Sequence, residues 1–237
     1  MSGKLPRAIV FDVFGSVVDW RTSLIDELTA FGAERRIEAN WVKLVDDWRG
    51  EYIPSLKKVY KGELPWMTLD DLHRASLETL VAGQGIEGLT EADLAYMTRG
   101  WHRLKPWPDS VAGLRRLKQG FIIAPLSNGN VSLLVDMAKG ADLPWDLVLG
   151  CDLFGRYKPA PETYLGAARL LGLEPGEVMM AAAHNGDLKA AKALGLMTAF
   201  FARPTEYGPR QEYDLAPTGD WSYVASDIED LARQLGV

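Results

Sequence analysis

The stretch Ala8-Ile9-Val10-Phe11-Asp12-Val13-Phe14-Gly15-Ser16 decides how the rest of the chain is interpreted. Its first four residues form an uninterrupted apolar run, which is typical of a strand buried on both faces. Asp12 then places a carboxylate at the carboxyl end of that predicted strand, where α/β proteins bind their ligands. Taken alone, Asp12 could be a structural cap or an ion-pair partner.

Similar short apolar runs recur along the chain, and helical patterns lie between them. The runs cover residues 121–126, 147–149, 178–183, 198–201 and 223–225. The helices between them are predicted at 131–139, 161–171 and 189–194. This alternation predicts an α/β fold, a Rossmann-like parallel sheet with helices on both faces.

The first and second apolar runs are separated by about a hundred residues, far more than one crossover helix requires. Helices are predicted in this gap over residues 22–31, 37–56, 68–81 and 90–103. We therefore expect residues 19–105 to form an all-helical cap inserted after the first strand. Residues 1–18 and 106–237 are expected to form the core.

The bulk composition excludes some classes of protein. A chain of 237 residues with 47% hydrophobic and 24% charged residues is typical of a soluble globular protein. Its net charge of -6 argues against a nucleic-acid partner. The single cysteine, Cys151, excludes an intrachain disulfide. The apolar stretch 8–14 is too short for a membrane span or a signal-peptide core, so we expect a cytoplasmic protein with no membrane partner.

Polar side chains follow several of the predicted strands. Besides Asp12, they belong to Ser127-Asn128-Gly129-Asn130, to the loop Tyr157-Lys158-Pro159 and to His184-Asn185-Gly186-Asp187. Because these segments are expected at one edge of the sheet, they form a candidate active site.

These segments, in this order and with a cap after the first strand, resemble the four motifs of the haloacid dehalogenase (HAD) superfamily. The resemblance covers the whole chain. It implies that Asp12 is a nucleophile, that Lys158 keeps the neighbouring carboxylates ionised, and that Asp187 activates water. Asp187 could instead only cap the helix that follows it.

Phe14 separates two branches of that superfamily. Its phosphatases carry at this position a second aspartate that protonates the leaving alcohol. A phenylalanine there resembles the L-2-haloacid dehalogenase (type II) branch, whose halide leaving group needs no proton. Asp12 and Asp187 facing Lys158 would also make a poor magnesium cage, so no metal and no cofactor are expected.

The resemblance therefore implies hydrolytic dehalogenation of short 2-haloalkanoic acids to 2-hydroxy acids through an aspartyl ester on Asp12. The expected partners are the 2-haloacid substrate and the halide product. The resemblance also implies a homodimer, because that branch is often dimeric. A Mg-dependent phosphatase and a non-catalytic binding protein on the same fold are the alternatives.

The remaining site residues are assigned by the same resemblance. Arg49, beside Trp48 in the cap, is expected to face the departing halide, with Trp66 and Asn128 completing the halide pocket. The residues expected to contact the substrate are Phe14, Ser16, Ser127 and Tyr164. Arg49 could instead be a surface arginine, and Tyr164 a core tyrosine.

His184 departs from the better-known dehalogenases, which carry an asparagine at this position. It could orient the hydrolytic water or contact the substrate, or it could be a buried structural histidine. The other histidines and most tryptophans are expected only to pack in the core or cap. They are His73, His102, Trp20, Trp41, Trp101, Trp107, Trp145 and Trp221.

Overall fold

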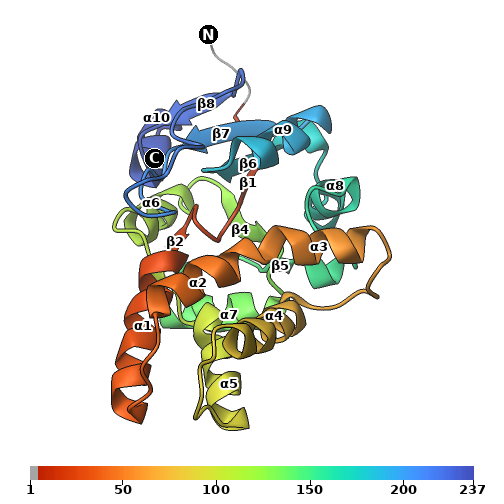
Figure 1. Ribbon diagram of the computed structural model, residues 1–237. Helices are drawn as coiled ribbons and strands as arrows, with labels where there is room; N and C mark the ends of the chain where they lie inside the picture. The colour runs from red at the N-terminus through yellow and green to blue at the C-terminus, as the bar shows by residue number, and fades with distance from the viewer. Residues whose placement is uncertain (1–4) are drawn as a thin grey trace.

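A computed structural model of the chain describes residues 5–237, so residues 1–4 of the expected core lie outside the described part. The described chain contains a parallel sheet in the order β5-β4-β1-β6-β7-β8 (Figure 1). Its strands are β1 (Ala8–Phe11), β4 (Ile122–Ser127), β5 (Leu149–Gly150), β6 (Val178–Ala182), β7 (Met197–Phe201) and β8 (Tyr223–Ala225). Each apolar run identified in the sequence overlaps one of these strands.

The central strand β1 is buried on both faces. Ile9 and Phe11 point to one side of the sheet, whereas Ala8 and Val10 point to the other. The first side is covered by α6 (Ser110–Leu117), α7 (Val131–Gly140) and α10 (Ile228–Gln234), and the second by α8 (Pro161–Leu170) and α9 (Asn185–Ala193). The predicted α/β fold with helices on both faces of a parallel sheet is confirmed.

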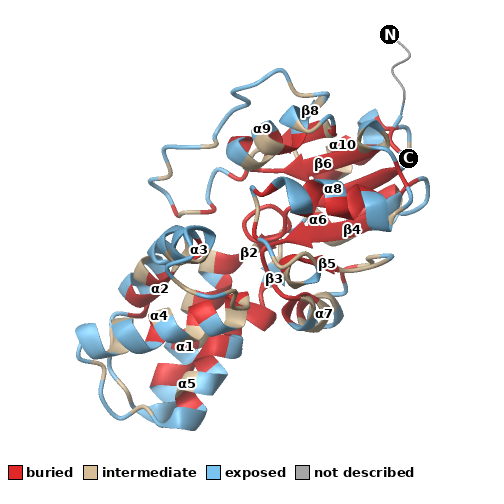
Figure 2. Cartoon of the chain, turned by 90° about the vertical axis from the view of Figure 1, so that its right-hand side faces the viewer, coloured by how far each residue is buried: buried red, intermediate tan, exposed pale blue. Residues whose placement is uncertain are grey.

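The chain between β1 and β4 is mainly helical. Its elements are α1 (Trp20–Arg35), α2 (Trp41–Gly50), α3 (Tyr52–Tyr60), α4 (Leu69–Gly83), α5 (Glu91–Thr98) and a 3₁₀ turn at Arg99–His102. A short antiparallel pair, β2 (Val18–Asp19) and β3 (Lys105–Pro106), joins the start and the end of this segment. Figures 1 and 2 show helices α1–α5 gathered beside the sheet. None of the helices in residues 5–237 is long and apolar enough to cross a membrane.

The prediction of one continuous helix over residues 37–56 is wrong. The chain instead forms α2 and α3, with Glu51 between them. Pro54 explains the break, because its ring would clash with the carbonyl of Gly50 in a continuous helix and it has no N–H to donate. The break matters for function, since Arg49 and Tyr52 lie on either side of it and both reach the same cavity.

The strand register brings the candidate residues to one edge of the sheet. In β1, Phe11 pairs with Pro125 of β4 and with Ala181 of β6. The residues that follow these three strands therefore emerge side by side. This edge also lies where the strand order reverses around β1, which is the usual ligand position in open parallel sheets.

Candidate active site

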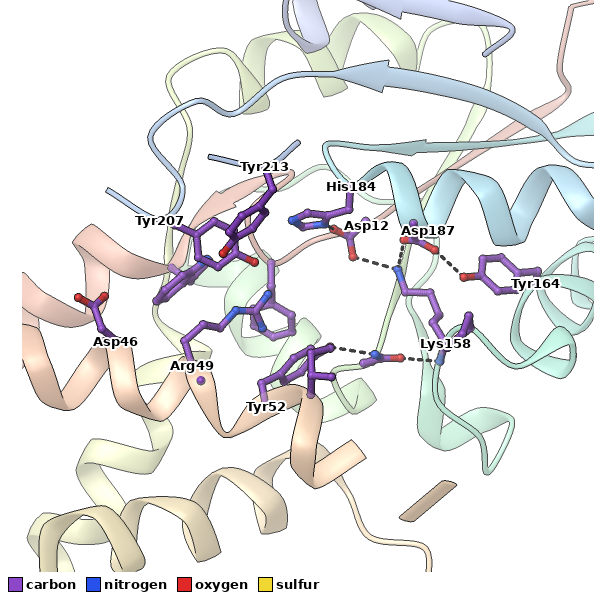
Figure 3. Close-up of a pocket in the computed structure, with 17 residues that line it drawn as sticks. Asp12, Asp46, Arg49, Tyr52, Lys158, Tyr164, His184, Asp187, Tyr207 and Tyr213 are labelled. Carbon is purple, nitrogen blue, oxygen red and sulfur yellow. Dashed lines mark hydrogen bonds and ion pairs between the residues drawn. The ribbon is translucent and has the colours of Figure 1, made fainter. Parts of the chain in front are cut away.

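Asp12 directly follows β1, and its carboxylate is largely buried. Its two oxygens have different partners (Figure 3). Oδ1 accepts a hydrogen bond from Lys158 Nζ at 2.9 Å. Oδ2 accepts one from Ser16 Oγ at 2.7 Å and lies 2.9 Å from His184 Nδ1. Three donor groups thus fix one carboxylate in place.

These donors keep Asp12 charged. Burial by itself raises the pKa of this carboxyl, because desolvation disfavours the charged form. The positive charge of Lys158, then His184 and the Ser16 hydroxyl, outweigh burial and bring the pKa of Asp12 well below its ordinary value. The result is an ionised carboxylate at neutral pH, which a nucleophile requires.

Lys158 connects Asp12 to the second predicted carboxylate. Its Nζ lies 2.5 Å from Asp187 Oδ2, and the Tyr164 hydroxyl donates to Asp187 Oδ1 at 2.6 Å. Burial lowers the pKa of Lys158, but the charges of Asp12 and Asp187 reverse this effect and raise it overall. Lys158 is therefore an ammonium ion held between two carboxylates, with Tyr164 fixing the far side of Asp187 (Figure 3).

His184 bridges Asp12 to a carboxylate that the sequence analysis did not identify, Glu206. His184 Nε2 lies 2.8 Å from Glu206 Oε2. The other carboxylate oxygen accepts from Trp20 Nε1 at 3.0 Å, so Trp20 does more than pack. Burial lowers the pKa of His184, but the charge of Glu206 and the bond to Asp12 raise it well above its usual value.

Gly15 makes room for this arrangement. It has a φ of +86°, a conformation that favours glycine, and a Cβ there would lie only 2.0 Å from Glu206 Oε1. The buried Glu206 carboxylate is therefore packed directly against the turn that follows Asp12. In the sequence, Gly15 indicates that another group can approach the backbone closely at this turn, but it does not identify that group as Glu206.

Arg49 reaches the cavity from the end of α2. Its guanidinium lies over the rings of Tyr52, at 4.3 Å, and Trp20, at 5.3 Å. Nη1 is buried and has no hydrogen-bond partner within residues 5–237. A cation whose N–H groups are not all used is suited to receive an anion.

Asn128 joins the core side of the cavity to α3. Its amide nitrogen donates to the Tyr52 hydroxyl at 2.8 Å, and its carbonyl accepts from the Lys158 backbone N–H at 2.7 Å. The buried Cys151 thiol lies 3.2 Å from the same carbonyl. Asn128 therefore fixes both the loop that carries Lys158 and the tyrosine beneath Arg49.

The side chains surround an open cavity of about 780 Å³. The predicted site residues on its wall are Asp12, Phe14, Arg49, Asn128, Lys158, Tyr164, His184 and Asp187. Phe14 is almost completely buried and packs edge-on against Trp101. Two serines lie behind the wall. The single proton of the Ser16 hydroxyl is directed to Asp12, and the fully buried Ser127 hydroxyl accepts from the Gly129 N–H.

Trp66 is not brought to this cavity. It lies in the segment between α3 and α4, where its ring packs at a tilt against Tyr157 of the loop before α8, with ring centroids 4.7 Å apart. There it lines a separate cavity of about 580 Å³. The Tyr157 hydroxyl donates to the Met67 carbonyl and holds this turn in place. The expected position of Trp66 beside the halide is corrected accordingly, and Trp20 and Tyr52 supply the aromatic surfaces around Arg49 instead.

The arrangement does not suit a divalent cation. Lys158 Nζ stands between Asp12 and Asp187, where a metal would need their oxygens. Within the described residues, no three or more His, Cys, Asp or Glu side chains are grouped to hold a metal ion.

Sequence reasoning missed the loop between β7 and β8, which supplies Glu206, Tyr207 and Tyr213 to the site. Asn185 anchors its far end. The Asn185 side chain donates to Asp214 and to the Ala216 carbonyl, and it accepts from Thr218 N–H and Trp221 Nε1. A loop without regular structure carries no periodic pattern, so its approach to Asp12 could not be read from spacing.

Comparison with known proteins agrees with this geometry. Residues 6–195 match the family of haloacid dehalogenase-like hydrolases. Among solved structures, the chain is similar to the L-2-haloacid dehalogenase PA0810, with 55% identity, a TM-score of 0.95 and coverage of 97% of this chain and 98% of that one. It is also similar to the defluorinating L-2-haloacid dehalogenase Rha0230, with 50% identity, a TM-score of 0.96 and coverage of 100% and 97%.

Two curated relatives represent both branches considered above. An (S)-2-haloacid dehalogenase of Xanthobacter autotrophicus is 30% identical over 209 residues, which cover 83% of this chain and 75% of the relative. A phosphoglycolate phosphatase of Aquifex aeolicus is 34% identical over 197 residues, which cover 81% and 83%.

Proposed function

Because this chain belongs to the haloacid dehalogenase-like hydrolases, we propose that it hydrolyses the carbon–halogen bond of short 2-haloalkanoic acids. The products are a 2-hydroxy acid and a halide ion. The observation that carries the proposal is Arg49, a buried guanidinium on the wall of the cavity that Asp12 enters, with an N–H that has no partner in the described part of the chain. The dehalogenase names of relatives at 50 to 55% identity support it.

In the first step, an Asp12 oxygen attacks C2 of the substrate and displaces the halide. Asp12 is ionised and fixed by three donors, so it needs no base to become a nucleophile. Arg49 stabilises the departing anion, with the Tyr52 and Trp20 rings shielding that charge from water. Phe14 occupies the position of a general acid, which suits a leaving group that departs without a proton.

In the second step, water attacks the carbonyl carbon of the ester on Asp12. Asp187 is the carboxylate placed to take the water proton, while Lys158 and Tyr164 hold its orientation. The Lys158 ammonium also lies within hydrogen-bond reach of Asp12 Oδ1. The water oxygen remains on Asp12, and the original aspartate oxygen leaves with the product.

We further propose that residues 19–105 act as the cap over a core formed by residues 1–18 and 106–237. This segment supplies Arg49 and Tyr52 to the cavity wall, whereas Lys158 and His184 come from the core. A cytoplasmic location and a homodimer stay predictions, and light scattering on the purified protein would measure the second.

A magnesium-dependent phosphatase is the second candidate. The phosphoglycolate phosphatase from Aquifex aeolicus is 34% identical to this chain, and the dehalogenase from Xanthobacter autotrophicus is 30% identical. Phe14 counts against a phosphatase, and so does Asp187, which is followed by no second acid in α9. Without an acid at position 14, the leaving alcohol has no proton donor at that point of the site.

The test compares halide release from L-2-chloropropionate in the presence of a chelator with p-nitrophenyl phosphate turnover in the presence of magnesium. We expect halide release that persists with the chelator and disappears in Asp12→Asn. Fluoroacetate and bromoacetate extend the same assay to other halogens, since one similar structure is of a defluorinating enzyme. Phosphate release without halide release would refute the proposal. A protein that only binds its ligand would show neither.

Single turnover in heavy-oxygen water tests the covalent route. The label should enter Asp12 first, because water attacks the enzyme's own carbonyl carbon. Label that goes directly into the 2-hydroxy acid would exclude the aspartyl ester.

A further inference from the structure

The two oxygens of Asp12 are held by different numbers of donors. Oδ1 has Lys158 Nζ, whereas Oδ2 has both Ser16 Oγ and His184 Nδ1. Each hydrogen bond withdraws electron density from the oxygen that accepts it. Oδ1 is therefore the better nucleophile, and Oδ2 is the oxygen that becomes the carbonyl of the ester.

Both ring nitrogens of His184 face carboxylate oxygens, Asp12 Oδ2 on one side and Glu206 Oε2 on the other. An ionised carboxylate only accepts hydrogen bonds. His184 must therefore donate from both nitrogens, which makes it an imidazolium. In this state it has no lone pair with which to take a proton from water, so it is not the general base of the second step.

We propose that Ser16 Oγ and His184 Nδ1 form the oxyanion hole in which the aspartyl ester is hydrolysed, with Glu206 as the positioning residue that keeps His184 an imidazolium. This inference rests on the proposed function. It makes His184 an oxyanion donor in the second step and gives a role to Glu206, which lies outside the recognised motifs.

The electron movements fit this assignment. Water attacks Cγ of Asp12, one of its protons passes to Asp187, and the carbonyl electron pair moves onto Oδ2. Ser16 and His184 then donate to that oxyanion. When the intermediate collapses, the bond between Cγ and Oδ1 breaks and the pair leaves on Oδ1. The proton still on the added oxygen passes to this alkoxide, which gives the 2-hydroxy acid and restores the Asp12 carboxylate.

Glu206 is required because Asp12 loses its charge in the ester. Once Oδ1 is alkylated, Asp12 is neutral and no longer a counter-ion for His184. Glu206 then supplies the negative charge next to the ring. Its carboxylate is 1% exposed and fixed from the other side by Trp20 Nε1 at 3.0 Å. It also lies 4.0 Å from Arg49 Nη2, so it is held by cap and core together.

The experiment is a rapid-quench measurement with L-2-chloropropionate that follows halide release and 2-hydroxy acid formation separately. Intact-protein mass after quenching reports the ester on Asp12. The variants are His184→Ala, which removes one oxyanion donor, and Glu206→Gln, which keeps the shape of the side chain and removes its charge. Glu212→Gln, at an exposed position of the same loop, is the matched control.

We expect the rate of the halide burst to be unchanged or higher in both variants. His184→Ala removes a hydrogen-bond donor from Asp12, and Glu206→Gln removes the charge that keeps His184 a cation beside Asp12. Ester hydrolysis should fall about 10²–10³-fold in His184→Ala, the usual cost of one oxyanion-hole donor, and less in Glu206→Gln. The ester should then accumulate in both variants. Glu212→Gln should match the wild type in both phases.

A purely structural role would slow both phases together, and that outcome in Glu206→Gln would overturn the assignment. An unchanged hydrolysis rate in His184→Ala would overturn it as well. If His184→Ala does not fold, Glu206→Gln still distinguishes a structural role, which slows both phases, from the proposed role, which slows only ester hydrolysis. Failure of the proposed function itself is a different result, namely no halide burst from the wild-type enzyme with any haloacid.

Discussion

Replacing Lys158 with methionine would leave the Asp12 and Asp187 carboxylates without the ammonium that lies between them. The side chains of all three residues are about nine-tenths buried, so solvent cannot take over this role. Methionine keeps the length and apolar stem of the lysine, and the substitution therefore tests the charge more than the packing. We expect losses of both stability and nucleophile ionisation.

The stability loss follows from the burial of the pair. Removing one partner of a buried ion pair costs about 3–5 kcal/mol, because the other charge is left uncompensated. The folded-state pKa of Asp12 lies below its ordinary 3.8, so its ionised form stabilises the wild-type fold above that pH, and this stabilisation is lost as the pH falls. Without the Lys158 charge, less remains to offset the effect of burial on Asp12, and the pKa of its carboxyl rises.

The assay has two parts, urea unfolding and the pH dependence of the halide burst. The wild-type burst should be independent of pH down to the acid range, whereas Lys158→Met should show an acid limb at higher pH, falling about tenfold per pH unit. The control is Lys192→Met on α9, where the lysine is half-exposed and its Nζ lies 3.5 Å from exposed Asp220. That change should cost less than about 0.5 kcal/mol. A Lys158→Met burst with wild-type rate and pH dependence would refute the reasoning.

Two further predictions concern neighbouring parts of the molecule. Asn185→Ala removes the side chain that anchors the loop between β7 and β8, at a cost of about 1–3 kcal/mol for the buried groups left unpaired. It should raise KM and speed hydrogen exchange in that loop, while exchange in β1 stays unchanged. The second concerns His102, whose Nε2 lies 3.0 Å from Asp70 Oδ1 and whose Nδ1 lies 2.9 Å from Asp136 Oδ2. Burial lowers the pKa of His102, but these hydrogen bonds raise it above 6.5 overall. Its stabilisation is complete below pH 6.5 and is lost as the pH rises through the folded-state pKa. The stability difference between wild type and His102→Asn should therefore shrink with rising pH in urea titrations, and a difference that grows would contradict it.

The strands could be predicted because burial on both faces leaves a strong local signal. A run such as Ala8–Phe11 has no polar side to expose, so few other structures accommodate it. The helices of the cap segment were harder to delimit. The apolar spacing on both sides of Gly50 continues through the break, and only the backbone chemistry of Pro54 interrupts it.

The site was predictable where a residue comes within two positions of a strand end, as for Asp12 and His184, because the parallel register sets their neighbours. Glu206 lies 186 residues from Trp20 and 22 from His184, and it approaches both through an irregular loop. No periodicity relates these positions. Trp66 is the opposite case, a residue that was expected at the cavity of Asp12 but packs against Tyr157 at a different cavity.

The charges of the site indicate which substrates it can hold. The ion-paired groups around Asp12 are three carboxylates and three cations, namely Asp12, Asp187 and Glu206 with Lys158, His184 and Arg49. Asp46, a further carboxylate on the cavity wall, is neutralised by its ion pair with Arg21. A 2-haloacid brings one negative charge, and when Asp12 is alkylated its lost charge reappears on the halide beside Arg49. The total charge therefore stays constant through the first step, and only its position changes. A phosphate dianion would add two charges next to the ionised Asp12, and the side chains by themselves supply no cation in excess to offset them. The charge balance thus favours a monoanionic substrate with an anionic leaving group, independently of the missing acid at position 14.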